Sequence, residues 1–281
     1  MKKPFVLFLI SLFFLLSSKA QQNKPTSSAL PTVKILADSF YIPQLNRYRT
    51  IRICLPIDYN ADLQKRYPVI YMHDGQNLFD KKTAYAGEWG VDECLDSLQK
   101  RSGKGFIVVG IDNGGTKRLD ELTPWSHKKY GGGEGAKYID FIVQTLKPFV
   151  DKNYRTLPKR KNTVIGGSSL GGLISVYAAF KYPKIFGKVI SFSPAYWINL
   201  DSIKVFIHNN PLKYRTKIYS YAGVKEGNEM KDPFAEIESY FKKAGIKEKN
   251  HIQSQSIDGE HKEFYWRREF PKAMAWLFDL N

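Results

Sequence analysis

The sequence predicts an α/β fold, with one mostly parallel sheet of about eight strands and helices on both faces. Short runs rich in β-branched and aromatic residues alternate along the chain with longer stretches of helical period. The first two strand-like runs have no helix between them, whereas the later runs alternate with helices. This order is typical of a parallel sheet that helices cover on both sides.

The individual elements can be placed from the same periodicity. Strands are expected near residues 33–40, 47–55, 68–73, 106–111, 162–166, 187–193, 216–222 and 251–257. Helices are expected near residues 88–100, 134–150, 170–182, 232–243 and 262–279. Glycine-rich stretches bracket residues 113–134, which are expected to form a long loop. Loops at the carboxyl ends of parallel strands build the binding crevice of such folds.

The N-terminal end predicts export. Lys2 and Lys3 precede an apolar run at residues 5–16, and small residues lead up to Ala20. This run is shorter than the roughly 20 apolar residues that span a bilayer, so a secretory signal over residues 1–20 is favoured over an uncleaved anchor. We expect cleavage after Ala20, a secreted or periplasmic location and no stable membrane insertion. Residues 21–32 are expected to be a flexible leader, and residues 33–281 a single folded domain.

The composition is basic, with 43 Lys and Arg against 27 Asp and Glu and a net charge of +16. The basic residues are scattered, for example as Lys81-Lys82, Lys128-Lys129, Lys159-Arg160-Lys161 and Lys242-Lys243. A basic surface can favour anionic polysaccharide or membrane surfaces. However, no aromatic-interleaved nucleic-acid module accompanies these residues, so we expect solvated faces and no nucleic-acid partner.

The two cysteines, Cys54 and Cys94, would meet an oxidising compartment after export, where they either pair or remain buried thiols. Neither lies in a CxxC or Cys/His spacing, and no other ligand cluster is evident. We therefore expect no metal site.

The segment from Gly166 to Gly172 predicts a serine nucleophile. It runs from an expected strand into an expected helix, which is the context of the nucleophile-elbow motif G-x-S-x-G. Ser169 has Gly167 two residues before it and Gly171 two residues after it, whereas Ser168 does not fit this frame. The two glycines let the strand and helix approach closely in a strained turn. A tight turn with an N-capping serine is the alternative.

A serine hydroxyl needs a base, which follows it in the chain on this fold, in the order serine, acid, histidine. His261 is our choice, because it lies just past the carboxyl end of the last expected strand, at the same edge of the sheet as the elbow. His251 opens that strand and should lie at the far edge. His208 precedes the seventh strand and leaves no room for an acid after it.

The acid that orients the histidine is expected in a loop after a late strand. Glu226 is the first carboxylate after the strand that ends near Ala222, and it is our choice. Glu229 and Asp232 are close enough in sequence to serve instead. Asp258 and Glu260 lie nearer His261 but are more typical of turn residues.

Two backbone N–H groups are expected to form an oxyanion hole. One is that of Leu170, the residue after the nucleophile. The other belongs to the loop after the third strand, where Gly75 permits close backbone approach, so Gln76 or Gly75 is the expected donor. His73, at the end of the buried strand before this loop, is expected to be structural.

Several motifs together resemble the esterase D-like branch of the α/β-hydrolases, which includes feruloyl and acetyl-xylan esterases, siderophore esterases and mycolyltransferases. They are Tyr71 to Asp80, Trp89-Gly90-Val91-Asp92, Gly110-Ile111-Asp112-Asn113, the elbow, Ser193-Pro194-Ala195-Tyr196-Trp197 and Gly259-Glu260-His261. The resemblance implies an α/β-hydrolase domain, ester hydrolysis through an acyl-enzyme, the roles given to Ser169 and His261, and no metal or organic cofactor. Some relatives carry Asp at the acid position, where this chain offers Glu226.

The resemblance leaves the substrate open. An ester of an acylated carbohydrate, carrying feruloyl or acetyl groups, is the expected small-molecule or oligosaccharide substrate, because flat aromatic rings stack on sugars. Trp125, Tyr196 and Trp197 are the expected substrate-binding residues. The alternatives are a siderophore or other small-ester hydrolase, an acyltransferase, and a non-catalytic carbohydrate-binding protein.

Overall fold

A computed structural model describes residues 26–280 of the chain; the expected signal at residues 1–20 lies outside them. Eight strands form one sheet in the order β1 (Val33–Ile42), β2 (Arg47–Cys54), β4 (Ile107–Ile111), β3 (Val69–His73), β7 (Thr163–Ser168), β8 (Lys188–Phe192), β9 (Lys217–Gly223) and β10 (His251–Ser256). The pairings β1–β2 and β2–β4 are antiparallel, and all later pairings in this sheet are parallel. The predicted fold class is confirmed.

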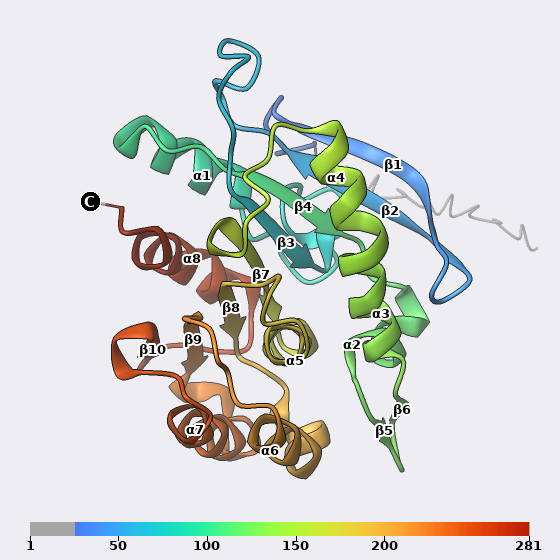
Figure 1. Ribbon diagram of the computed structural model, residues 1–281, viewed down its shortest axis with the longest axis vertical. Helices are drawn as coiled ribbons and strands as arrows, with labels where there is room; N and C mark the ends of the chain where they lie inside the picture. The colour runs from blue at the N-terminus through green and yellow to red at the C-terminus, as the bar shows by residue number, and fades with distance from the viewer. Residues whose placement is uncertain (1–25, 281) are drawn as a thin grey trace, which may run out of the picture.

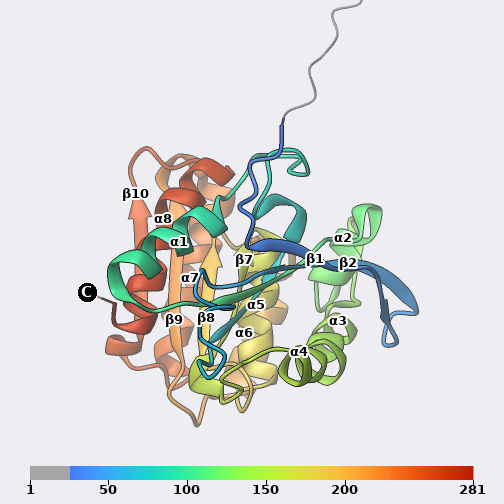
Figure 2. The same cartoon turned by 90° about the horizontal axis from the view of Figure 1, so that it is seen from above.

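Helices cover both faces of the sheet (Figures 1 and 2). One face carries α1 (Val91–Ser102) and α8 (Glu263–Phe278), which contact each other. The other face carries α5 (Leu170–Lys181), α6 (Leu200–Asn209), α7 (Asn228–Lys243), and a continuous helical segment made of α3 (Gly135–Phe141), a π-helical turn (Ile142–Leu146) and α4 (Lys147–Asn153). Two separate apolar clusters form the core, one on each side of the sheet.

The central elements are buried because they are covered on every side. All residues of β3, β4 and β7 are buried, as expected for parallel strands in the middle of such a sheet. Helix α5 packs against β7 and β8 and is itself covered by α2 (Arg118–Leu122), α3 and α6, so all its residues except Lys181 are buried. A helix buried all round shows no polar stripe. This packing holds the start of α5 in a fixed position.

The structure differs from the sequence prediction in two places. Helix α6 was not predicted, because its segment precedes a Pro- and Asn-rich stretch; Ile203 and Ile207 nevertheless bury one face of it. The expected long loop at residues 113–134 contains the short helix α2 (Arg118–Leu122) and a small hairpin of β5 (Ser126–His127) and β6 (Gly131–Gly132). Glu121 of α2 is buried and ion-paired with Arg49, which anchors this insertion to β2.

Residues that precede β1 form hydrogen bonds with the folded domain. Ser27 donates a hydrogen bond to Asp80, Ser28 donates one to Glu88, and the backbone N–H of Leu30 donates one to Asp92. These residues belong to the stretch expected as a leader.

Cys54 and Cys94 are free thiols in the structure. Burial raises the pKa of each to about 12, so both are neutral and poorly reactive. Among residues 26–280, no helix is long and apolar enough to cross a bilayer.

Candidate functional site

Ser169 occupies the sharp turn between β7 and α5. Its backbone has φ 57° and ψ −122°, a conformation that costs a non-glycine residue about 1–3 kcal/mol. The N–H of Ser169 donates to the carbonyl of Phe192, 2.9 Å away, which ties the turn to the end of β8. A Cβ at Gly167 would lie 3.1 Å from both Gly171 Cα and His73 Cδ2. The close packing therefore favours the glycine frame of the motif, and Ser169, not Ser168, is the serine of this motif with the strained backbone.

His261 and Glu226 meet at the same edge of the sheet. Glu226 follows β9 and His261 follows β10. His261 Nδ1 lies 2.9 Å from Glu226 Oε2, with the glutamate side chain fully buried and the histidine 37% exposed. The structure thus pairs the predicted base with the predicted acid. The alternative acids Asp258 and Glu260 form ion pairs with Arg268 and Lys262 instead.

A chain of hydrogen bonds holds Oε1 of Glu226, the carboxylate oxygen that does not contact His261. Glu226 Oε1 accepts bonds of 2.6 Å from the hydroxyl of Ser193 and from the backbone N–H of Gly223. Ser193 Oγ in turn accepts a 2.8 Å bond from the indole N–H of Trp266, whose ring also meets His261 edge-on at 5.1 Å. Ser193 is fully buried and has a positive φ of 42°, which directs its side chain towards Glu226. Sequence reasoning noted the Ser193 motif but did not identify this role, because it depends on contacts between β8, β9 and α8.

Ser169 and His261 both line a cavity of about 160 Å³. The other walls come from the loop after β3, the segment before α1, helix α2 and the start of α8, through His73, Asp74, Asn77, Tyr85, Ala86, Trp89, Arg118, Ser168, Glu263 and Trp266. Among the hydrogen bonds of the described residues, none joins Ser169 directly to His261. Contacts of this kind often tighten only when substrate is bound.

The loop after β3 packs tightly beside the elbow. An added Cβ at Gly75 would lie 2.7 Å from the carbonyl carbon of Gly110, so a larger residue would force this loop to shift. Leu170 is the first residue of α5, and the first N–H groups of a helix have no partner within it. Leu170 follows the end of β7 and the Gly75–Gln76 segment follows the end of the neighbouring β3, so both lie at the same edge of the sheet. His73 packs there so closely that a Cβ at Gly167 or Gly171 would lie 3.1 or 3.2 Å from it.

His73 is a neutral, buried residue in this arrangement. It is 1% exposed, and its Nδ1 lies 2.9 Å from the hydroxyl of Tyr138. Burial lowers its pKa to about 4. These properties agree with the structural role expected for it.

Arg118 is a site residue that sequence reasoning missed. Its Nε and Nη2 donate to the two carboxylate oxygens of Asp74 at 2.7 and 2.9 Å, and Asn113 donates a third bond to that carboxylate. Burial alone would raise the pKa of Asp74, but the bonds from Arg118 outweigh it and hold the pKa below its usual value. The ion pair fixes α2 against the loop after β3 and places a cation at the cavity wall. A lone arginine in an expected loop carries no local signal of this contact.

The three predicted substrate-binding aromatics do not line the Ser169 cavity. Tyr196 is fully buried in the core, so the prediction that it binds substrate is wrong. Trp125 lines a different recess beside α6, and Trp197 packs against Tyr130 at the surface. The aromatic rings that do line the cavity are those of Tyr85, Trp89 and Trp266.

Residues 42–277 match the model of the family described as "Putative esterase", which covers almost all of the described fold. The chain belongs to this esterase family. It is a carboxylic ester hydrolase with the α/β-hydrolase fold.

Curated proteins and solved structures include several that are similar to this chain. The uncharacterized protein YbbA of Bacillus subtilis is 29% identical over 83% of this chain and 94% of its own length. An iron(III) salmochelin esterase of Escherichia coli is 26% identical over 61% of this chain and 36% of its own. A solved ferulic acid esterase shares the fold, with a TM-score of 0.68, 18% identity and coverage of 88% of this chain and 98% of that one.

Proposed function

We propose that this esterase is exported and cleaves its substrate through an acyl-enzyme, with Ser169 as nucleophile, His261 as base and Glu226 as the orienting acid. The observation that carries the proposal is the pairing of His261 Nδ1 with the buried Glu226 carboxylate at the cavity that also holds the strained Ser169 turn. Export rests on the sequence at residues 1–20.

The proposed reaction follows from the roles of these groups. Ser169 Oγ attacks the ester carbonyl while its proton passes to Nε2 of His261, and Glu226 stabilises the imidazolium that forms. The N–H groups of Leu170 and of Gln76 or Gly75 bind the oxyanion. The intermediate collapses, the alcohol leaves with the proton from His261, and the acyl group stays on Ser169. Water then attacks the acyl-enzyme with His261 as base, which releases the acid and restores the serine.

The cavity favours an ester with both an aromatic or sugar ring and polar groups. Tyr85 is exposed and provides a flat surface, while Arg118 and Glu263 provide polar groups at the wall of the same cavity. Glu263 is 6% exposed, and its pKa is raised, first by burial and then by nearby Asp74. An acylated carbohydrate, such as a feruloylated or acetylated oligosaccharide, is the proposed substrate. A catechol-bearing siderophore ester is the second candidate, favoured by the likeness to the salmochelin esterase.

The test compares three alanine variants on p-nitrophenyl acetate and on a panel of feruloylated, acetylated and siderophore esters. Ser169→Ala and His261→Ala should each lose at least about 1,000-fold in kcat, and Glu226→Ala should lose less, because orienting a histidine is partly replaceable. Ser168→Ala is the matched control and should retain most of the activity. Loss of activity in Ser168→Ala with retention in Ser169→Ala would overturn the assignment. The ester with the highest kcat/KM distinguishes the two substrate classes.

A further inference from the structure

The basic residues that are scattered in the sequence gather at one edge of the folded sheet. The strands β4, β3, β7, β8, β9 and β10 are neighbours in the sheet and run parallel to one another. Their N-terminal ends therefore lie along the same edge of the sheet. Cations precede or open these strands, at Lys65 and Arg66 before β3, Lys104 before β4, Lys159, Arg160 and Lys161 before β7, Lys188 in β8, Arg215 and Lys217 at β9, and Lys247 and Lys249 before β10. We call this set, with Lys213, the basic edge. It lies opposite the Ser169 cavity, whose lining includes residues at or just after the ends of β3, β7 and β10.

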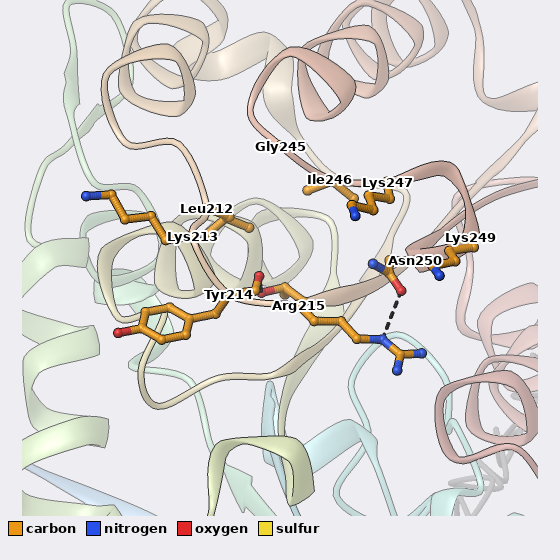
Figure 3. A pocket seen from close by; sticks show the side chains of 10 residues that line it. Leu212, Lys213, Tyr214, Arg215, Gly245, Ile246, Lys247, Lys249 and Asn250 are labelled. Atoms are coloured by element: carbon orange, nitrogen blue, oxygen red, sulfur yellow. Dashed lines mark hydrogen bonds between the residues drawn. The ribbon is translucent and has the colours of Figure 1, made fainter.

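The basic edge contains two recesses. The first, of about 370 Å³, is lined by residues 212–216, 245–247 and 249–250, which include four cations and no carboxylate (Figure 3). The second, of about 590 Å³, is lined by residues 65–68, 102–105, 157–159 and 161–162, which include five cations and again no carboxylate. Two concave sites of the same charge at one edge therefore suit a ligand with more than one negative group.

One cation of the first recess is held in a defined orientation. The Nε–H of Arg215 donates a 3.1 Å bond to Oδ1 of Asn250, which is 5% exposed (Figure 3). This bond leaves the two terminal nitrogens of the guanidinium directed away from Asn250. A guanidinium held in this way can bind a carboxylate or sulfate through two parallel hydrogen bonds. Lys247 and Lys249 line the same recess.

The charges of the basic edge are only partly compensated. Asp58 pairs with Lys65 at 2.6 Å, and Asp279 pairs with Lys217 at 2.8 Å. Glu248 is exposed between Lys247 and Lys249. Burial, followed by the nearby Lys217 and Lys104, lowers the pKa of Lys188 to about 8, which is the response of an ammonium group to burial among like charges.

We propose that the basic edge binds an anionic polysaccharide whose carboxylate or sulfate groups enter the two recesses. Among the residues that line the recesses, Tyr214 is the only large apolar side chain that is well exposed, and the Arg160 guanidinium lies 5.3 Å from its ring. Strong membrane binding combines attraction to anionic lipids with apolar side chains that insert below the headgroups, and the second part has little support here. A glycan needs only cations and a flat ring for a sugar face, and both are present here. This surface is separate from the proposed catalytic groups, and it holds the esterase on a polymer without occupying the Ser169 cavity.

The test measures binding to polygalacturonate, with neutral dextran and vesicles containing anionic phosphatidylglycerol as the comparison probes. One variant carries Arg215→Gln, Lys247→Gln and Lys249→Gln, and a second carries Lys104→Gln, Lys159→Gln and Lys161→Gln. The matched control carries Lys81→Gln, Lys82→Gln and Lys137→Gln, which remove the same charge from exposed positions elsewhere. All three should hydrolyse p-nitrophenyl acetate at the rate of the unmodified enzyme, so that failure of this proposal is distinguishable from failure of the catalytic one.

The expected result is salt-sensitive binding to polygalacturonate and no binding to dextran. Each basic-edge variant should bind about tenfold more weakly, whereas the control should change by less than about twofold. An equal loss in the control would show a general charge effect and would overturn the proposal. Tighter binding to the anionic vesicles than to polygalacturonate would also overturn it, in favour of a membrane partner.

Discussion

The contact between Ser193 and Glu226 gives the sharpest test of how the site is organised. Ser193→Ala removes the 2.6 Å bond to Glu226 Oε1 and leaves that oxygen with the Gly223 N–H alone. A hydrogen bond to a charged group contributes about 1.5–3 kcal/mol. If about 1.4 kcal/mol of this is lost when the His261 imidazolium forms, kcat falls about tenfold. KM should not change, because Ser193 is fully buried and cannot contact substrate.

The assay is steady-state hydrolysis of p-nitrophenyl acetate by Ser193→Ala, Glu226→Gln and the double variant. In the Glu226→Gln background the serine change should cost little, because the carboxylate that it orients is already gone. Ser191→Ala is the matched control: Ser191 is equally buried in β8, but its hydroxyl bonds to the carbonyl of Gly172 rather than to Glu226. An unchanged kcat in Ser193→Ala, or the same loss in both backgrounds, would refute this reasoning. Thermal unfolding measures separately the cost of leaving the Trp266 indole N–H without its acceptor.

Two further predictions concern the loop after β3 and the start of α1. Gly75→Ala places a Cβ 2.7 Å from the Gly110 carbonyl carbon, so the loop must shift. We expect a lower kcat and a loss of about 1–3 kcal/mol in the free energy of unfolding. An unchanged kcat would exclude Gly75–Gln76 as oxyanion donors. Burial is the main reason that the pKa of Asp92 is raised to about 7; nearby Glu93 also raises it, and the bond from the Leu30 N–H opposes both. Asp92 therefore binds a proton more tightly in the folded protein than in the unfolded chain. The free energy of unfolding should fall as pH rises from about 4 to about 7. Asp92→Asn should remove this loss and be more stable than the unmodified enzyme at about pH 8, as urea unfolding at about pH 5 and about pH 8 would reveal. Equal pH dependence in both proteins would contradict the assignment to Asp92.

Local patterns predicted the parts of the site that depend on chain order. The glycine frame identified Ser169, because only that serine has glycines two positions away on both sides. The alternation of strands and helices placed His261 and Glu226 at one edge, because parallel strands end together. Their 2.9 Å contact agrees with that inference.

The remaining parts depend on contacts that no local pattern records. Arg118 gains its place in the site only through Asp74, which is 44 residues away in the chain. Tyr196 was expected to bind substrate, but residue type alone does not tell which face of a short turn is buried. The basic edge was missed for the same reason, since its cations come from segments that meet only when the strands align.

The position of His73 has a consequence for how the serine turn is held in place. Its ring and Cβ fill the space that side chains at Gly167 and Gly171 would occupy, so the loop after β3 and the serine turn are wedged against each other. This tight packing fixes Ser169, the proposed nucleophile, relative to the Gly75–Gln76 backbone, the proposed oxyanion donor. Their relative geometry is set when the chain folds, and the energy of substrate binding is not spent on assembling it.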